Sequence, residues 1–456
     1  MKHNPAIGAF RVFRKFRVFG VFGVFRVLGV LGILGVFGLS GDLKAQSPFS
    51  LAWHGFVNPH YYADSRSVVG GREDMMLFYP KPVVRDSLGS DINSGWQADM
   101  LAITARLGLT VTGPNMLGAR TKAYIEGDFT GSTNATINDL RLRHAYIQMD
   151  WLKNYGVEIP SSLHHTLIVG QYWYPMVIHE IMPMTNPLNM GSPFHCYARQ
   201  PQVRYEFISH GWEVVAAACW QLDNMSQGLL DGVPTSSTQF ARHSLVPELN
   251  AQLRYYPIGN LMLGAAVNAK TIQPIVNTTG VAAPHHLHTS VSYSLFGKAV
   301  LGPVTVKAQA LLNNSLYEGC SLGGYLLRVY SGQPHQLAAR DWHFDTYWLD
   351  MERSRGHWCP GLFIGFGHNR DFGIPLSSGT TEDYALGRGF DIEHLWRLQP
   401  RLTYTTLTGL SFTAEAEYTR AAYGRLATAG PDRWYEHDPA AAADNIRLSL
   451  SMVYSF

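Results

Sequence analysis

Long apolar runs are absent from this 456-residue chain after its first 45 residues. Further along, apolar stretches are short and are broken by polar or charged residues at alternate positions. A helix that spans a bilayer needs about 20 consecutive apolar residues, so residues 46–456 contain no candidate for one. An exported chain without helical spans is either soluble or a β-barrel of the outer membrane, because only helices and closed barrels satisfy every backbone hydrogen bond in lipid.

Cysteine is scarce, and its four positions are Cys196, Cys219, Cys320 and Cys359. No two of them have the C-x-x-C spacing typical of zinc or redox sites. An oxidising compartment permits disulfides, but the three possible pairings stay open, and unpaired cysteines are an equal alternative. The chain also lacks a nucleophile elbow and a zinc-protease helix motif. We therefore expect no enzyme, no metal site and no cofactor.

Charged residues are few as well, at 15% of the chain. Residues 1–45 hold seven basic residues and one acidic residue, so the remainder carries 29 basic and 33 acidic residues, a net charge of −4. The slight basicity of the whole chain is therefore a property of its first segment. We expect no nucleic-acid partner.

Residues 1–45 have the composition of an export signal. Basic residues between positions 2 and 17 precede the apolar stretch Val27–Leu39, and Ala45 offers a small residue at a cleavage position. The apolar core of 13 residues is shorter than the ~20 of a membrane anchor, which favours a cleaved signal. We predict a signal peptide at residues 1–45 and a chain that begins at Gln46 after cleavage.

Apolar and polar residues alternate with a period of two through the rest of the chain. In the terminal stretch Asn445–Phe456, every second residue from Ile446 onward is apolar, whereas Arg447, Ser449 and Ser451 fall on the other face. Such alternation indicates a strand between an apolar and a polar environment, and a terminal aromatic residue is what we expect of the closing strand of an outer-membrane barrel. We predict that this strand pairs with Leu51–Tyr62.

About sixteen such segments occur, an even number as in bacterial barrels. The clearest are Leu101–Thr112, Ala119–Phe129, Leu140–Trp151 (with a bulge near Ala145), Leu249–Tyr255, Trp396–Tyr404 and Leu410–Tyr418. Their connections alternate between short turns and long loops. We predict an all-β fold, a transmembrane antiparallel β-barrel of about 16 strands over residues 46–456, with short periplasmic turns and long external loops. A secreted sandwich is the alternative, but recurrent charges on one face would be costly in its core.

Three stretches resemble the DcaP-like trimeric porins and the related phosphate-selective porins. They read L-R-L-R-H-A-Y-I-Q-M at Leu140–Met149, L-I-V-G-Q-Y-W at Leu167–Trp173 and R-Q-P-Q-V-R-Y at Arg199–Tyr205. The order of strands and loops is similar over most of the chain, but the amino-acid sequence itself is similar only over residues 96–210. No single motif is diagnostic. It implies a 16-stranded homotrimeric porin that passes small, often anionic solutes. The junction Leu43–Gln46 resembles Bacteroidetes export signals, whereas the unusual leader and the loop cysteines depart from the family.

In such porins the third external loop folds into the lumen and narrows it. The resemblance implies the same role here for residues 174–200. The candidate residues in this constriction loop are His179, Glu180, Asn186 and Arg199. A loop that packs over the barrel mouth is the alternative.

Basic side chains on neighbouring strands are expected to point into the lumen. They are Arg106, Arg120, Lys122, Arg141, Arg143, Arg204 and Arg254. Facing cations in a narrow pore attract anions, and arginine offers bidentate geometry to carboxylate or phosphate. The competing interpretation is that these cations pair with Glu126, Asp128 and Glu206 and only fill the lumen.

The sequence thus favours a passive porin for small polar, preferably anionic, solutes in the lipid bilayer of the outer membrane. A plugged barrel that serves as an adhesin or receptor is the main alternative, and a barrel enzyme is a lesser one. His286 and His288 fall on one strand face, which is compatible with a metal, but a loop or interface role is favoured.

Overall fold

The structure, a computed structural model, describes residues 49–153, 163–186, 189–279, 285–312, 315–330, 337–376, 381–429 and 432–456. The predicted signal peptide at residues 1–45 lies outside the described residues. No helix in the described part combines the length and the hydrophobicity that a membrane span requires.

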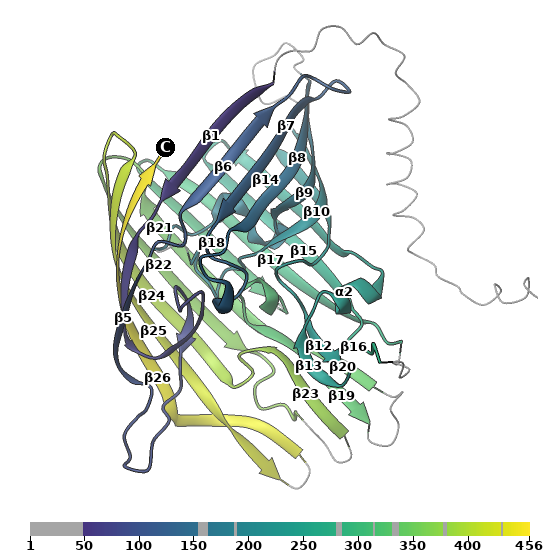
Figure 1. The fold of residues 1–456 in the computed structure, drawn as a ribbon, viewed down its shortest axis with the longest axis vertical. Coiled ribbons are helices and arrows are strands. Elements are labelled where there is room, and N and C mark those ends of the chain that lie inside the picture. Colours follow the sequence, from purple (N-terminus) through teal and green to yellow (C-terminus); the bar gives the residue numbers. More distant parts are fainter. Residues whose placement is uncertain are drawn as a thin grey trace, which may run out of the picture. The chain divides into compact units, whose positions relative to one another are not determined.

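Within the described residues, eighteen antiparallel segments join edge to edge in a single sheet that closes on itself, as Figure 1 shows. The segments are β1 (Ser50–Val57), β2 (His60–Arg66), β5 (Ser94–Leu101), β6 (Arg106–Thr112), β7 (Arg120–Asp128), β8 (Arg141–Lys153), β9 (Leu163–Trp173), β10 (Arg199–Ser209), β11 (Trp212–Cys219), β14 (Glu248–Ile258), β15 (Leu261–Ile272), β17 (His288–Leu301), β18 (Val304–Leu312), β21 (Phe344–Arg353), β22 (Trp358–Asn369), β24 (Ile392–Thr405), β25 (Leu410–Ala429) and β26 (Asp432–Ser455).

Two of the wall strands are each interrupted once, so the eighteen segments make a barrel of sixteen strands. β1 and β2 are halves of one strand, since both pair with β26 in a single register. β6 pairs with β1 and β5 pairs with β2, which makes β5 and β6 the halves of the neighbouring strand. The predicted all-β barrel of about 16 strands is confirmed.

The prediction of one continuous strand over Leu101–Thr112 is wrong. β5 ends at Leu101 and β6 begins at Arg106, with a turn between them in which the Ala105 N–H donates to the Ala102 carbonyl at 3.0 Å. Ile103 is thereby turned inward, where it is 5% exposed and packs in the apolar cluster that fills the barrel. Burial of this side chain favours the interruption over a strand that continues through residues 102–105.

The first and last strands close the barrel. Phe56 stands opposite Ser455 and Asp64 stands opposite Arg447, as the sequence predicts for the terminal strand. Along β26 the alternation has the expected sense, because Leu448 and Leu450 on the outer face are 48% and 58% exposed, whereas Arg447 on the inner face is 1% exposed.

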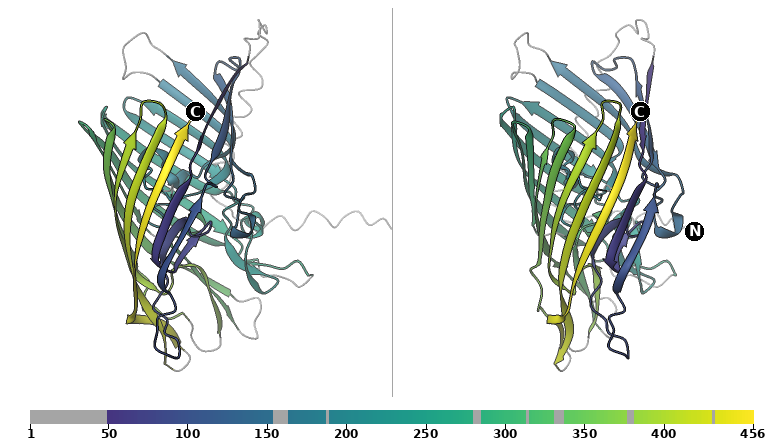
Figure 2. Two further views of the ribbon diagram at one scale, coloured as in Figure 1. Left: turned by 60° about the vertical axis from the view of Figure 1, so that its left-hand side comes forward. Right: turned by 90° about the vertical axis from the view of Figure 1, so that its left-hand side faces the viewer.

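The two ends of the barrel differ in the length of their connections. At the end where the C-terminus lies, short turns cover residues 113–119, 210–211, 259–260, 302–303, 354–357 and 406–409. The long connections and the extended β25–β26 hairpin lie at the opposite end (Figure 2). The predicted alternation of short turns and long loops therefore separates the two rims.

The long connections contain the remaining elements of the described chain. These are β3 (Val68–Gly71), β4 (Met76–Pro80), η1 (Asn134–Thr136), η2 (Pro175–Val177), η3 (His179–Ile181), β12 (Gln227–Leu230), β13 (Val233–Ser236), α2 (Gln239–Ser244), β16 (Ile275–Val276), η4 (Tyr317–Gly319), β19 (Gly323–Tyr330), β20 (Leu337–Trp342) and β23 (Thr381–Arg388). β13, β12 and β16 form one small sheet, and β20, β19 and β23 form another.

Replacing Arg447 tests the seam, the pairing of β26 with β1 and β2 that closes the barrel. Arg447 and Asp64 are buried partners at 2.7 Å, so Arg447→Met leaves an uncompensated carboxylate inside the barrel. We expect the free energy of unfolding to fall by about 3–5 kcal/mol, measured as a lower urea midpoint by tryptophan fluorescence in detergent. The control is Arg420→Met, because Arg420 forms a half-exposed pair with Asp444 on the same hairpin and its loss should cost at most ~1 kcal/mol. Equal losses in the two variants would contradict this role of the seam.

Candidate functional site, an arginine-lined cavity

The connection between β9 and β10, residues 174–198, runs inside the barrel. Its side chains are buried along most of its described length, and Met176, Ile181 and Phe194 have no exposed surface. Apolar residues of this loop form the centre of the largest buried cluster of the described chain. The sequence of this loop, rich in Met, Pro and Ile, therefore provides an apolar core where an open barrel would hold water.

Polar groups of the far wall hold this loop in place. Gln252 on β14 donates to the Pro175 carbonyl at 2.7 Å, and Lys307 on β18 donates to the Met182 carbonyl at 3.1 Å. Arg397 on β24 donates to the Ser192 carbonyl at 2.7 Å. Because the loop starts at β9 and ends at β10, contacts with β14, β18 and β24 show that it crosses the lumen.

The hairpin of β3 and β4 also turns inward. Arg447 donates to the carbonyls of Asp74 (2.7 Å) and Met75 (3.1 Å) in its turn. Arg397 donates at 3.1 Å to the carbonyls of both Leu77 and Phe78 on β4. The hairpin thus lies on the side of the lumen next to β24–β26, whereas the inward loop crosses the lumen.

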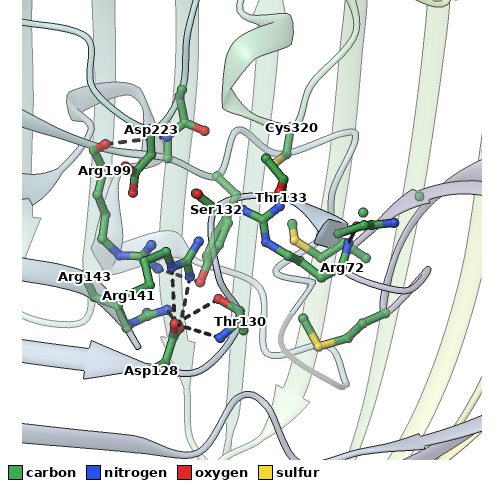
Figure 3. A pocket seen from close by; sticks show the side chains of 18 of the residues that line it. Arg72, Asp128, Thr130, Ser132, Thr133, Arg141, Arg143, Arg199, Asp223 and Cys320 are labelled. Carbon is green, nitrogen blue, oxygen red and sulfur yellow. Dashed lines mark hydrogen bonds and ion pairs between the residues drawn. The ribbon is translucent and has the colours of Figure 1, made fainter. Parts of the chain in front are cut away.

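A cavity of about 420 Å³ remains between these inward segments and the wall of β6–β8. Six arginines contribute to its lining, and Figure 3 shows the labelled members converging on it. They are Arg72, Arg106, Arg141, Arg143, Arg199 and Arg388. The carboxylates in the lining are Asp128, Asp223 and Glu318, and Glu318 already pairs with Lys270 at 2.6 Å. The cavity therefore carries a net positive charge.

On the wall side, three guanidiniums share two carboxylates. Arg141 and Arg143 pair with Asp128 at 3.0 and 2.7 Å. Arg143 also binds Glu126 at 2.6 Å, and Arg106 lies 3.6 Å from the same carboxylate. This group contributes one positive charge in excess, and Arg143 Nη2 is buried with no hydrogen-bond acceptor among the described residues.

A β-bulge brings Arg143 into this group. The register of β7 and β8 shifts between Glu126 and Gly127, so that Glu126 faces His144 while Gly127 faces Leu142. Arg143 is the extra residue, and both it and His144 are buried. The bulge expected near Ala145 is present two residues earlier.

Two further cavity arginines have neutral partners. Arg199, the first residue of β10, donates to the Tyr197 hydroxyl at 2.7 Å and lies over the Trp173 ring at 4.4 Å. Arg388 donates to the carbonyls of Tyr317 and Ser321 at 3.3 and 3.2 Å. While Tyr197 is protonated, neither charge is cancelled by these contacts, which adds to the positive charge of the cavity.

Tyr197 is the acidic group closest to these cations in the inward loop. Burial alone would raise the pKa of its hydroxyl, but the guanidiniums of Arg143, Arg199 and Arg106 outweigh burial and lower the pKa to about 7. The phenol is therefore easier to ionise than an ordinary tyrosine, and its ionisation would remove one unit of net positive charge from the cavity.

The structure separates the predicted lumen cations into two groups. Arg106, Arg141 and Arg143 line the cavity. Arg204 and Arg254 are buried in pairs, Arg204 with Glu206 at 2.6 Å and Arg254 with Glu180 at 2.8 Å and Glu213 at 3.0 Å. Arg120 and Lys122 lie at the short-turn end of β7, where Arg120 is exposed and Lys122 is half-buried.

The predicted loop residues also divide. Asn186 donates to Glu415 and to Ser449 and accepts from Ser451, which anchors the loop to β25 and β26. Glu180 is the partner of Arg254, and His179 is exposed near the Trp173 ring. Only Arg199 lines the cavity.

Several lining residues escaped the sequence analysis, among them Arg72, Tyr197 and Arg388. Arg72 lies in the β3–β4 turn and Tyr197 lies in the inward loop. Neither segment is a strand, so the alternation of polar and apolar residues does not predict where their side chains point. Arg388 ends β23 in a small sheet outside the barrel wall. No local pattern marks such residues as neighbours of β6–β8, although their residue types fit an anion site.

No family model and no curated protein matches the chain. Among solved structures, the outer membrane channel DcaP of Acinetobacter baumannii matches 92% of this chain and 100% of its own, at a TM-score of 0.59 and 16% identity. The two barrels share one fold. The likeness to DcaP-like porins expected from the sequence is thus confirmed for the fold.

Two other solved barrels are less similar. An anion-selective porin from Comamonas acidovorans covers 90% of this chain and 100% of its own, at a TM-score of 0.49 and 9% identity. OmpT, an outer membrane protein of Vibrio cholerae, covers 91% of this chain and 100% of its own, at a TM-score of 0.46 and 9% identity.

Titration of Tyr197 is directly measurable. We expect one tyrosine of the folded protein to ionise near pH 7, because the surrounding guanidiniums stabilise the phenolate, and this phase should be missing from Tyr197→Phe. The measurement is the ultraviolet absorbance of tyrosinate between pH 5 and 9 in detergent. Tyr293→Phe, which removes an exposed tyrosine on the outer face of β17, should leave the phase unchanged. A wild-type curve without a transition below pH 8.5 would contradict the expectation.

Proposed function

We propose that this chain is an outer-membrane porin through which small anionic solutes diffuse passively. The observation that carries the proposal is the cavity lined by six arginines inside a closed barrel. A solute that bears a carboxylate or a phosphate would meet several guanidiniums at once, and arginine binds both groups in bidentate fashion. DcaP, which has the same fold, is an outer membrane channel.

The side chains on the outer face of the barrel support the proposal that the barrel lies in a lipid bilayer. Large apolar side chains such as Ile147, Leu253 and Leu295 are 58%, 47% and 55% exposed on it. Near the short-turn rim, Trp212 stacks on Tyr255 and Trp358 contacts Tyr404, with ring centroids 4.3 and 4.8 Å apart. An apolar band with aromatic residues at its rim is typical of transmembrane barrels. In this proposal residues 1–45 serve as the signal peptide for export.

The inward loop is the proposed constriction. Asn186 and Glu180 fix the loop to the walls, whereas Tyr197 and the adjoining Arg199 face the remaining space. Anchors on several walls keep the loop from swinging out. Solute size is then limited by the distance between this loop and β6–β8, and solute charge is selected by the arginines.

The excess of cations in the cavity sets the expected selectivity. A unit charge ~6 Å from an ion contributes up to about 3 kcal/mol at an effective dielectric constant of about 20, and bound carboxylates cancel only part of this. Arg143 Nη2 and Arg199 Nε are buried without an acceptor among the described residues. Unused donors on cations at a cavity wall favour an anionic occupant.

We expect potassium chloride gradients across planar bilayers to give reversal potentials that show a preference for anions. Arg199→Gln should reduce the anion-to-cation permeability ratio several-fold, because it removes a charge that no carboxylate of the described chain neutralises. Arg425→Gln is the matched control, since Arg425 lies on the exposed β25–β26 hairpin and pairs with Glu436. Phosphate in place of chloride tests the expected likeness to phosphate-selective porins.

The same recordings distinguish the alternatives. A preference for cations would overturn the anion selectivity but leave a channel in place. Absence of conductance from folded, heat-modifiable protein would favour a plugged receptor or adhesin, in which the inward loop and the β3–β4 hairpin close the lumen.

We further propose a homotrimer that uses the outer face of β2, β5 and β24–β26. An apolar concavity of about 680 Å³ on this face is lined by Tyr61, Met100, Leu402, Phe412, Ala414, Leu450 and other residues. Small and apolar residues allow close packing of neighbouring barrels.

Light scattering in mild detergent should give the mass of three chains. Ala414→Trp fills the concavity and should yield single barrels that stay folded, whereas Ala308→Trp on the outer face of β18 should leave the trimer intact. A monomeric wild-type protein would contradict the proposal, as would a trimer unaffected by Ala414→Trp.

A further inference from the structure

Two of the four cysteines lie on segments that meet inside the barrel. Cys196 is close to the end of the inward loop 174–198, and Cys320 directly follows η4. The Tyr197 N–H donates to the Gly319 carbonyl at 2.6 Å. A residue next to Cys196 is therefore hydrogen bonded to a residue next to Cys320.

The thiol of Cys196 points at this junction. A Cβ built on Gly319 would stand 2.6 Å from Cys196 Sγ, so the sulfur already touches the backbone that leads into Cys320. Consecutive Cα atoms are about 3.8 Å apart, and disulfide-bonded residues have Cα atoms about 4.4–6.8 Å apart. A cysteine directly after Gly319 therefore lies within reach of this sulfur after a side-chain rotation.

Electrostatics and backbone geometry agree with this closeness. Burial raises the pKa of the Cys196 thiol well above its usual range, and the nearby Cys320 raises it further, which agrees with the closeness of the two residues. Cys320 has a φ of +61°, a left-handed conformation that is uncommon for a residue with a Cβ. A covalent bond between the two loops would hold such a residue in place.

The other two cysteines lie elsewhere on the wall. Cys219 ends β11 beside Glu248 of β14. Cys359 is at the short-turn end of β22, with Sγ 3.5 Å from the Gly356 carbonyl oxygen, whereas Cys196 and Cys320 belong to connections of the opposite rim. The structure therefore favours one link, between the inward loop and the residue after η4, and leaves Cys219 and Cys359 unlinked.

We propose that Cys196 and Cys320 form a disulfide when the folded chain meets an oxidising compartment. The bond ties the inward loop to the connection between β18 and β19 and fixes Tyr197 and Arg199 at the edge of the cavity. The cross-link depends on the fold alone and would exist whether or not a solute crosses the barrel.

The oxidant that the step requires is a small-molecule or protein disulfide, R–S–S–R. Cys320 lines the cavity and is partly exposed, so it loses its proton and its thiolate attacks first. The attack breaks the S–S bond of the oxidant, forms a mixed disulfide and expels one R–S⁻, which takes up that proton. The Cys196 thiolate then attacks the Cys320 sulfur, forms the new S–S bond and expels the second R–S⁻, which takes up a proton. Two cysteine thiols lose two electrons and two protons, and one oxidant disulfide becomes two thiols.

Thiol mapping tests the proposal on the full chain, purified in detergent and shown to be folded by heat-modifiable migration. The reduced protein is treated with oxidised glutathione, then denatured, alkylated without reduction and digested. We expect a peptide pair linked through Cys196 and Cys320 in the mass spectrum, with alkylated thiols falling from four to two per chain. Closure should be faster at higher pH, because the buried Cys196 must ionise.

Single variants assign the bond. Cys196→Ser and Cys320→Ser should each abolish the linked peptide, whereas Cys219→Ser and Cys359→Ser should retain it. Four alkylated thiols after oxidation would overturn the proposal. So would a link from Cys196 to Cys219, or a glutathione adduct on Cys320 that never closes.

Discussion

The buried ion pair between Arg447 and Asp64 is the interaction on which the rest of this barrel depends. Its two hydrogen bonds, at 2.9 and 2.7 Å, join the last strand to the first. The same guanidinium donates to two carbonyls of the β3–β4 turn, which repays the cost of removing it from water. Closure of the barrel and placement of an inward hairpin therefore depend on the same side chain, because the donors of Arg447 are divided between Asp64 and the hairpin turn.

Arginines on the two sides of the lumen differ in the acceptors that their N–H groups bind. On the β24–β26 side, Arg397 pairs with Glu417 at 3.0 Å and donates to Thr419 and to the carbonyls of Ser192, Leu77 and Phe78. Its charge is therefore balanced, and its remaining donors anchor the inward backbone. On the β6–β8 side, three guanidiniums share two carboxylates and retain unused donors. The space that the inward segments leave open lies beside β6–β8, the side that retains charge.

The sequence predicted the wall well, because each wall residue has only two possible faces. Arg106, Arg141 and Arg143 were placed on the inner face by alternation alone. Prediction failed at Ala102–Ala105, where burial of Ile103 against residues distant in sequence overrides the local pattern. It also missed Arg72 and Arg388, since their position depends on loop packing and not on periodicity. Which cations stay free and which pair, as Arg254 does with Glu180 and Glu213, is decided only by the folded loops.

The bulge on β8 has a consequence for how such a barrel can change. When residues alternate strictly, the length of a strand fixes the number of its side chains that face the lumen. A new charged residue must then normally replace one of these inward side chains. Arg143 occupies an extra position, opposite which β7 has no residue of its own. One additional residue in β8 thus sets two successive side chains, Arg143 and His144, in the interior opposite Glu126 alone. Permeability in barrels of this kind can evolve by changes of length as well as by substitution.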